Sequence, residues 1–73
     1  MILEYDKEVD ALYIRIQEVE VARTVEVEEG TNLDFDADGK LIGVEILNAL
    51  ERYKPQDLFR VSSEALALME PVQ

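Results

Sequence analysis

The chain contains no cysteine and no histidine among its 73 residues. It therefore has no disulfide, no thiolate nucleophile and neither of the side chains that usually hold structural zinc. Without histidine it also lacks the most common general base near neutral pH, and Ser62 and Ser63 fit a helix cap better than a nucleophile. Acid–base work by paired carboxylates would need a cleft that raises one pKa, and a domain this small offers little room for one. We expect no enzyme activity and no cofactor.

Basic side chains are scarce, with 7 lysines and arginines against 17 acidic residues and a net charge of −10. Residues 1–47 hold 13 acids and 4 bases, a net charge of −9, whereas residues 48–73 carry only −1. Such a surface repels the phosphates of nucleic acids and attracts basic proteins, although solubility alone would also explain it. No apolar run approaches the length of a membrane span, so we expect no membrane contact. The lack of cysteine fits a cytoplasmic protein.

Length limits the chain to a single domain, residues 1–73, with a thin core. A domain of this size buries only about 60% of the surface that its unfolded chain exposes. Since neither a disulfide nor a zinc site can add stability, association with another chain is the remaining source. We therefore expect a homo-oligomer, in the simplest case a homodimer with two-fold symmetry.

The first two thirds of the chain alternate between apolar and polar residues, which is typical of half-buried antiparallel strands. We expect a four- to five-stranded antiparallel meander sheet, beginning with a short strand at Leu3 and Tyr5. The alternating apolar positions of the later strands are Leu12, Ile14 and Ile16, then Val25 and Val27, then Leu33 and Phe35.

One turn of the sheet is marked by Asp38-Gly39, a dipeptide that favours a two-residue type I′ hairpin loop. With that loop Phe35 faces Ile42 and Leu33 faces Val44, so each apolar residue meets another. The turn at Gly30 is ambiguous. It is either a hairpin with the loop 29–31 and a bulge, which pairs Val27 with Leu33, or one long strand bent at Gly30. We favour the hairpin, because 14 residues would be long for a strand.

After Glu45 the apolar residues follow helical spacing. Asn48 and Glu51 match a capping box, and we expect the helix to end at Pro55. A second helix should begin at Ser62 and end before Pro71. Each would have about two turns, too few to be stable alone, so both must pack on the sheet or on another subunit. The fold class is therefore α+β, a meander sheet followed by two short C-terminal helices.

The segment from Asp34 to Glu45 also matches the spacing of a calcium-binding loop. Asp34, Asp36, Asp38 and Glu45 take ligand positions 1, 3, 5 and 12 of that loop, and Gly39 takes position 6. Such a loop follows a helix, however, and the residues before Asp34 alternate as in a strand. A solvent-exposed acidic face is the interpretation that we favour, with divalent-metal binding at these four residues as the alternative.

Several residues are candidates for an interface. Tyr13 and Arg15 lie on the polar side of their strand, and in the two-residue hairpin Leu41 also points outward. Tyrosine and arginine are enriched at interface centres. Packing against a helix of the same chain would equally cover these residues. The complete set of interface candidates is Tyr13, Arg15, Leu41, Leu66 and Met69.

Residues 4–50 resemble a prokaryotic family known as domain of unknown function 2283. The motifs that carry the resemblance occur in order at residues 5–6 (YD), 10–15 (DALYIR), 24–27 (TVEV), 32–36 (NLDFD), 38–39 (DG) and 43–49 (GVEILNA). The resemblance implies no catalytic residues, because the family has no established active site. We interpret the chain as a small, acidic, homo-oligomeric protein-interaction domain. The most specific form of this interpretation is antitoxin-like capture of a basic protein partner, and the comparison with antitoxins is an analogy of size and charge.

Overall fold

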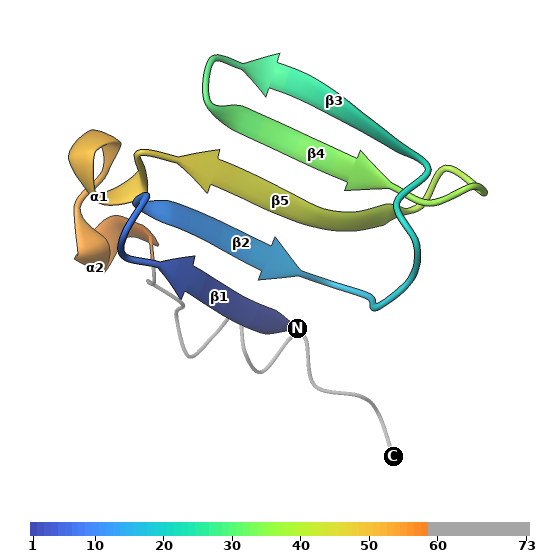
Figure 1. Ribbon diagram of the computed structural model, residues 1–73, viewed down its shortest axis with the longest axis horizontal. Helices are drawn as coiled ribbons and strands as arrows, with labels where there is room; N and C mark the ends of the chain where they lie inside the picture. The colour runs from blue at the N-terminus through green and yellow to red at the C-terminus, as the bar shows by residue number, and fades with distance from the viewer. Residues whose placement is uncertain (59–73) are drawn as a thin grey trace.

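A computed structural model of the chain describes residues 1–58, which form one five-stranded antiparallel sheet with two short helices at one end (Figure 1). The α+β class and the antiparallel sheet are confirmed. The helix expected from Ser62 lies outside the described residues. The strands are β1 (Ile2–Asp6), β2 (Ala11–Arg15), β3 (Arg23–Glu28), β4 (Thr31–Phe35) and β5 (Leu41–Leu47), and the helices are α1 (Ala49–Arg52) and α2 (Pro55–Leu58).

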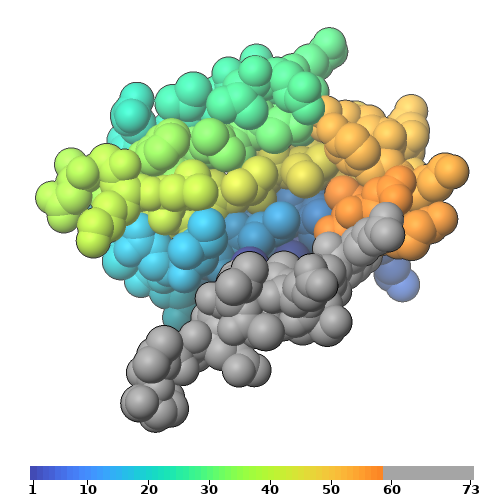
Figure 2. All heavy atoms as spheres, turned by 180° about the vertical axis from the view of Figure 1, so that it is seen from behind, coloured from blue at the N-terminus to red at the C-terminus, as the bar shows by residue number. Residues whose placement is uncertain are grey.

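The strand order is β1-β2-β5-β4-β3, which differs from a simple meander. Residues 16–22 leave the end of β2 and cross to the opposite edge of the sheet, where β3 begins (Figure 1). The longest strand, β5, thereby lies at the centre between β2 and β4, as the view from behind also shows (Figure 2). Strand β1 forms one edge of the sheet and β3 forms the other.

The register separates an apolar face from a polar face. Leu12 opposes Ile46, and Val44 lies between Ile14 of β2 and Leu33 of β4. These residues share one side of the sheet, because directly opposed residues of antiparallel strands point the same way. The core lies on this side, where Leu12 is only 1% exposed.

The β4–β5 hairpin has a three-residue loop and not the predicted two-residue loop. The N–H of Gly39 donates to the carbonyl of Asp36 at 3.0 Å, and the N–H of Asp36 donates to the carbonyl of Lys40 at 2.9 Å. Gly39 has a φ of +84°, whereas Asp38 does not have the positive φ that a type I′ turn needs. The Asp36 carboxylate also accepts the N–H groups of Asp38 and Lys40, which stabilises the longer loop.

A bulge in β5 compensates for this odd-length loop. Phe35 opposes Leu41, so its predicted pairing with Ile42 is wrong, but Leu33 opposes Val44 as predicted. Ile42 is the extra residue of the bulge; it is fully buried, and its carbonyl accepts the N–H of Ile16 at 2.7 Å. The loop and the bulge each shift the register by one residue, so apolar residues still face apolar residues further along the hairpin.

The turn at Gly30 is a hairpin, as predicted, but its register differs from the expected one. Val25 opposes Leu33, whereas we expected Val27 in that position. The loop is Glu29-Gly30 with Glu28 opposite Thr31, and the bulge falls at Val27, between Glu26 and Glu28. A bulge is required because an uninterrupted two-residue hairpin would place Val25 opposite Asp34, on the wrong face.

Helix α1 is capped by a residue that is distant in sequence. Asn48 occupies the N-cap position with a φ of 54° and makes no side-chain capping hydrogen bond, so the predicted capping box is wrong. The Asp10 carboxylate instead accepts the N–H of Leu50 at 3.0 Å and that of Glu51 at 3.2 Å. Pro55 starts α2, at the first helical position, where its missing N–H and fixed φ are tolerated.

The helices of residues 1–58 have four residues each, and neither is long or apolar enough to cross a membrane.

Candidate functional site

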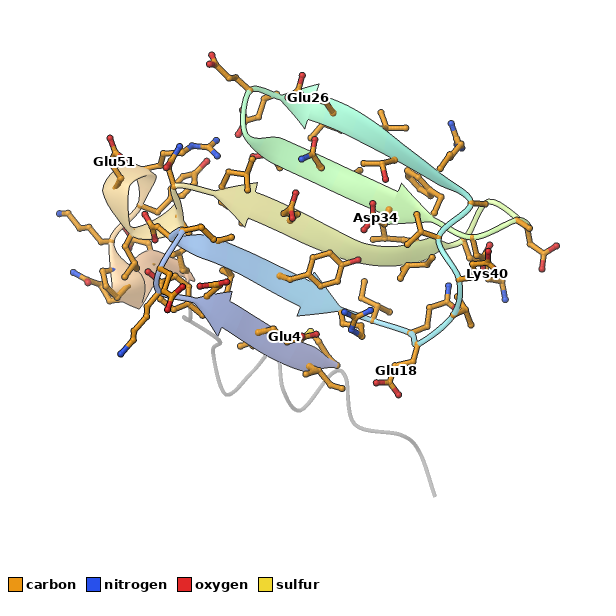
Figure 3. The ribbon with its side chains drawn as sticks, viewed as in Figure 1. Glu4, Glu18, Glu26, Asp34, Lys40 and Glu51 are labelled. Atoms are coloured by element: carbon orange, nitrogen blue, oxygen red, sulfur yellow. The ribbon has the colours of Figure 1, made fainter. Side chains whose placement is uncertain are left out.

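The polar face of the sheet is the candidate site, and Figure 3 looks onto it. Its residues come from alternate positions of all five strands and include five acids and one base. The acids are exposed on the edge strands and half-buried on β4 and β5. The charged members are Glu4, Asp6, Arg15, Glu26, Asp34 and Glu45.

Tyr13 connects the strands at the centre of this face. Its ring extends from β2 across Gly43 of β5, and its hydroxyl donates to Oδ2 of Asp34 on β4 at 2.7 Å. Thr24 on β3 donates its hydroxyl to the other oxygen, Oδ1 of Asp34, at 2.6 Å. A β-carbon at Gly43 would lie only 2.5 Å from the Tyr13 hydroxyl oxygen, so the ring can lie here only because residue 43 is glycine.

The environment of Tyr13 raises its pKa to about 12, first because burial disfavours the charged phenolate and second because the hydroxyl donates to Asp34. The Arg15 guanidinium lies 4.8 Å from the centre of the Tyr13 ring. Arg15 also forms an ion pair with Glu4, with 2.9 Å between Nε and Oε1. The phenol is therefore neutral near pH 7 and acts as a hydrogen-bond donor.

The structure does not gather the four residues of the calcium alternative into one site. Asp34 accepts the two hydroxyls, Asp36 accepts backbone N–H groups of its own loop, and Glu45 accepts the Asn32 amide at 3.1 Å. Strand β4 precedes the loop, where a calcium-binding motif would have a helix. Among residues 1–58 there is no group of three or more histidine, cysteine or carboxylate side chains placed to hold a metal ion.

The interface candidates fall into three groups. Tyr13 and Arg15 lie on the polar face, as predicted, where the Arg15 guanidinium lies over the Tyr13 ring and that ring lies over Gly43. Helices α1 and α2 lie at the end of the sheet (Figure 1) and do not cover these two residues. The prediction that Leu41 points outward is wrong, because the β5 bulge places it opposite Phe35. Leu66 and Met69 lie outside the described residues.

Two residues that the sequence did not single out hold the end of the sheet together. Asp10, in the β1–β2 turn, has a φ of 54° and accepts the Tyr5 hydroxyl at 2.7 Å in addition to capping α1. The pKa of Asp10 is lowered, first by the hydrogen bond from Leu50 N–H and then by that from Tyr5. An aspartate in a turn is common, and nothing nearby in sequence indicates a partner 40 residues away.

Arg52 is the second such residue. Its Nη1 donates to the carbonyls of Gly30 at 3.0 Å and Leu47 at 3.1 Å, and its Nη2 pairs with Glu28 at 3.1 Å. It thereby joins α1, the end of β5 and the β3–β4 turn. Lysine or arginine near a helix C-terminus is a common signal for carbonyl capping, but here the carbonyls belong mainly to other elements.

The side-chain donors of the polar face are paired with carboxylates of the same face. Tyr13 and Thr24 donate to Asp34, Asn32 donates to Glu45, and Arg15 donates to Glu4. The face carries five carboxylates against one guanidinium, so it accepts hydrogen bonds and attracts positive charge. The arrangement can therefore bind cationic donors.

Comparisons with known proteins agree with the resemblance seen in the sequence. Neither the curated proteins nor the solved structures give a match. A family model matches residues 2–49, which extend from the start of β1 to the first residue of α1 and include every residue of the polar face. The chain belongs to this family, which is described as protein of unknown function (DUF2283).

Proposed function

We propose that the chain is a non-catalytic protein-interaction domain that captures a basic partner on its polar face and that also associates with itself. The proposal rests mainly on one observation, that the side-chain donors of this face are paired with its own carboxylates, of which there are five against one base. A partner that approaches the face meets carboxylates, so lysine and arginine side chains are the groups that complement it. An antitoxin-like role, in which the basic partner is a small toxin, is the most specific form of this proposal.

The hydrogen bonds that fix the side chains of this face support binding over catalysis. Tyr13 and Asp34 are fixed by hydrogen bonds to other strands and need little reordering when a partner binds. The exposed carboxylates of Glu4 and Glu26 lie toward the two edges of the sheet (Figure 3). Charges at the rim of an interface mainly raise the association rate and make it sensitive to salt.

A labelled oligolysine peptide tests the face when two variants of equal net charge are compared. The first variant, Glu4→Gln with Glu26→Gln, removes two exposed charges from the polar face. The matched control, Glu18→Gln with Glu20→Gln, removes two exposed charges from the crossover between β2 and β3. Glu18 is labelled in Figure 3. Circular dichroism verifies that both variants are folded.

We expect fluorescence anisotropy to show weaker binding for the face variant than for the control. Exposed ion pairs contribute about 0.2–1 kcal/mol each, so losing two lowers the affinity about 2- to 30-fold. Added salt should weaken the binding of the native chain. An equal loss in the two variants would mean that net charge alone governs binding, and it would overturn the assignment to this face.

A further inference from the structure

The two edges of the sheet differ in how well they are protected against pairing with another strand. Both edges carry exposed acids, Glu4 and Asp6 on β1 and Glu26 and Glu28 on β3, but of the two only β3 also has a bulge, at Val27, and a bulge discourages edge-to-edge pairing. Strand β1 pairs with β2 in an unbroken register and contains no bulge. Within residues 1–58, β1 is the edge that is open to an added strand.

Strand β1 also exposes apolar side chains beside the core. Leu3 is 50% exposed and Tyr5 41%, although Tyr5 directly opposes Leu12, which is 1% exposed. The apolar face thus continues onto β1 and becomes exposed there. A strand added beside β1 would extend this face and cover part of these side chains, which favours association through the edge.

We propose that β1 pairs antiparallel with β1 of a second copy, with the two Leu3 residues opposite each other on the two-fold axis. The two sheets then form one continuous ten-stranded sheet. This inference deepens the self-association part of the proposed function and does not depend on capture of a basic partner.

Charge and side-chain orientation select this register. Centring the pair on Glu4 would oppose two glutamates, and centring it on Tyr5 would oppose Glu4 to Asp6 twice; like charges directly opposite are destabilising. A register shifted by one residue would join the polar face of one copy to the apolar face of the other. Centring on Ile2 would overlap only residues 1–3, whereas centring on Leu3 overlaps residues 1–5 and places Ile2 opposite Glu4, so no two acids meet. Within each copy, the ion pair with Arg15 at 2.9 Å partly offsets the charge of Glu4.

The net charge of −10 on each chain opposes this dimer. The repulsion acts over a long range and is screened by salt, so salt should strengthen self-association. Binding of a basic partner on the polar face has the opposite salt dependence. The two associations can therefore be separated in one protein by changing the ionic strength.

Disulfide trapping tests the register directly, because the chain has no cysteine of its own. In the proposed pair, Leu3→Cys places two cysteines opposite each other with about 4.5–5.5 Å between their Cα atoms, which a disulfide can span. Tyr5→Cys places them four residues out of register, about 14 Å apart. Val27→Cys provides a control on the other edge with similar exposure, 53% against 50%.

We expect mild oxidation to cross-link most of the Leu3→Cys protein and little of either control. Light scattering on the native chain should give a dimer mass that persists to lower protein concentration at high salt. Leu3→Lys should weaken the dimer at least tenfold and Val27→Lys should not, while a mixture of Leu3→Lys and Leu3→Glu should restore a dimer. Oligolysine binding at the polar face should persist in Leu3→Lys.

Each contrary result has a distinct meaning. A native chain that is monomeric at every concentration would overturn both the β1 pairing and the self-association in the proposed function. A dimer that Leu3→Cys fails to trap, or that Tyr5→Cys traps equally well, would overturn the β1 register and leave self-association standing. A dimer of the Leu3→Lys protein as stable as the native dimer would also overturn the β1 pairing. That result would mean that the β1 edge is not the dimer interface, whether or not another segment or a foreign strand occupies it.

Discussion

Replacing Gly43 with alanine tests the arrangement at the centre of the polar face. A β-carbon at this position would lie 2.5 Å from the Tyr13 hydroxyl oxygen and 2.7 Å from the carbonyl oxygen of Ile14, both far inside ordinary contact. The Tyr13 ring can turn away, although it then loses its hydrogen bond to Asp34. The Ile14 carbonyl belongs to the backbone of β2 and can move only if β2 and β5 separate.

The expected cost has two parts. Overpacking a close-packed site costs about 1–3 kcal/mol, and a lost hydrogen bond to a charged group costs about 1.5–3 kcal/mol. The two are partly alternatives, since a displaced ring relieves the clash, so we expect about 2–4 kcal/mol in total. A domain of this length has a free energy of unfolding of about 4–11 kcal/mol. Gly43→Ala should therefore lower the melting temperature by about 10–30 °C.

Urea unfolding measures the loss of stability, and tyrosinate absorbance measures the pKa of Tyr13. In Gly43→Ala that pKa should fall from about 12 toward its ordinary value of 10.0, because the ring leaves its covered site and Asp34. Gly39→Ala is the control. Its φ of +84° makes alanine strained by about 1–2 kcal/mol, but nothing lies within 4 Å of the new β-carbon and the Tyr13 titration should not change. A Gly43→Ala protein with native stability and native Tyr13 titration would refute the arrangement.

Three further changes probe the contacts that join distant parts of the chain. Tyr13→Phe should lower the free energy of unfolding by about 1–3 kcal/mol at neutral pH. Because folding raises the pKa of Tyr13, the native hydroxyl stabilises the fold fully below about pH 10, and this contribution is lost as the pH rises toward 12. Urea unfolding should therefore show that the stability of the variant declines less steeply at alkaline pH than that of the native chain. Asp10→Asn keeps a residue type that tolerates positive φ and removes the charge. Since folding lowers the pKa of Asp10, its contribution to stability is present above the ordinary pKa of 3.8 and is lost as the pH falls through the lowered pKa of the folded state. Acid unfolding followed by circular dichroism should therefore be less steep in the variant. An unchanged acid unfolding curve would contradict the capping role of Asp10. Arg52→Ala removes the donor to the carbonyls of Gly30 and Leu47 and should lower the free energy of urea unfolding by about 1–3 kcal/mol. The control Lys54→Ala, at an exposed residue, should change it by less than about 0.5 kcal/mol. Similar values for the two variants would contradict the role of Arg52 in joining these elements.

The amino-acid sequence alone indicated where the strands lie and, except at Leu41, which side of each strand is apolar. The alternation around Leu33 and around Val44 predicted which side of each strand is apolar, and parity predicted that these two residues oppose each other. Parity also predicted that the turn at Gly30 needs an irregularity, although not that it falls at Val27. These are local properties, because the direction of a side chain in a strand depends only on its position along that strand.

Only the tertiary structure decided which strands are neighbours and where the irregularities fall. Alternation is the same whether β2 pairs with β3 or with β5, so the sequence pattern favoured a meander and could not reveal the crossover. The hydrogen bond from Tyr13 to Asp34 across Gly43 depends on that strand order, because it needs β5 between β2 and β4. The capping of α1 by Asp10 depends on the end of β5 meeting the β1–β2 turn. Such contacts join residues 21 and 40 positions apart, and their stability comes from packing and hydrogen bonds that exist only in the assembled sheet.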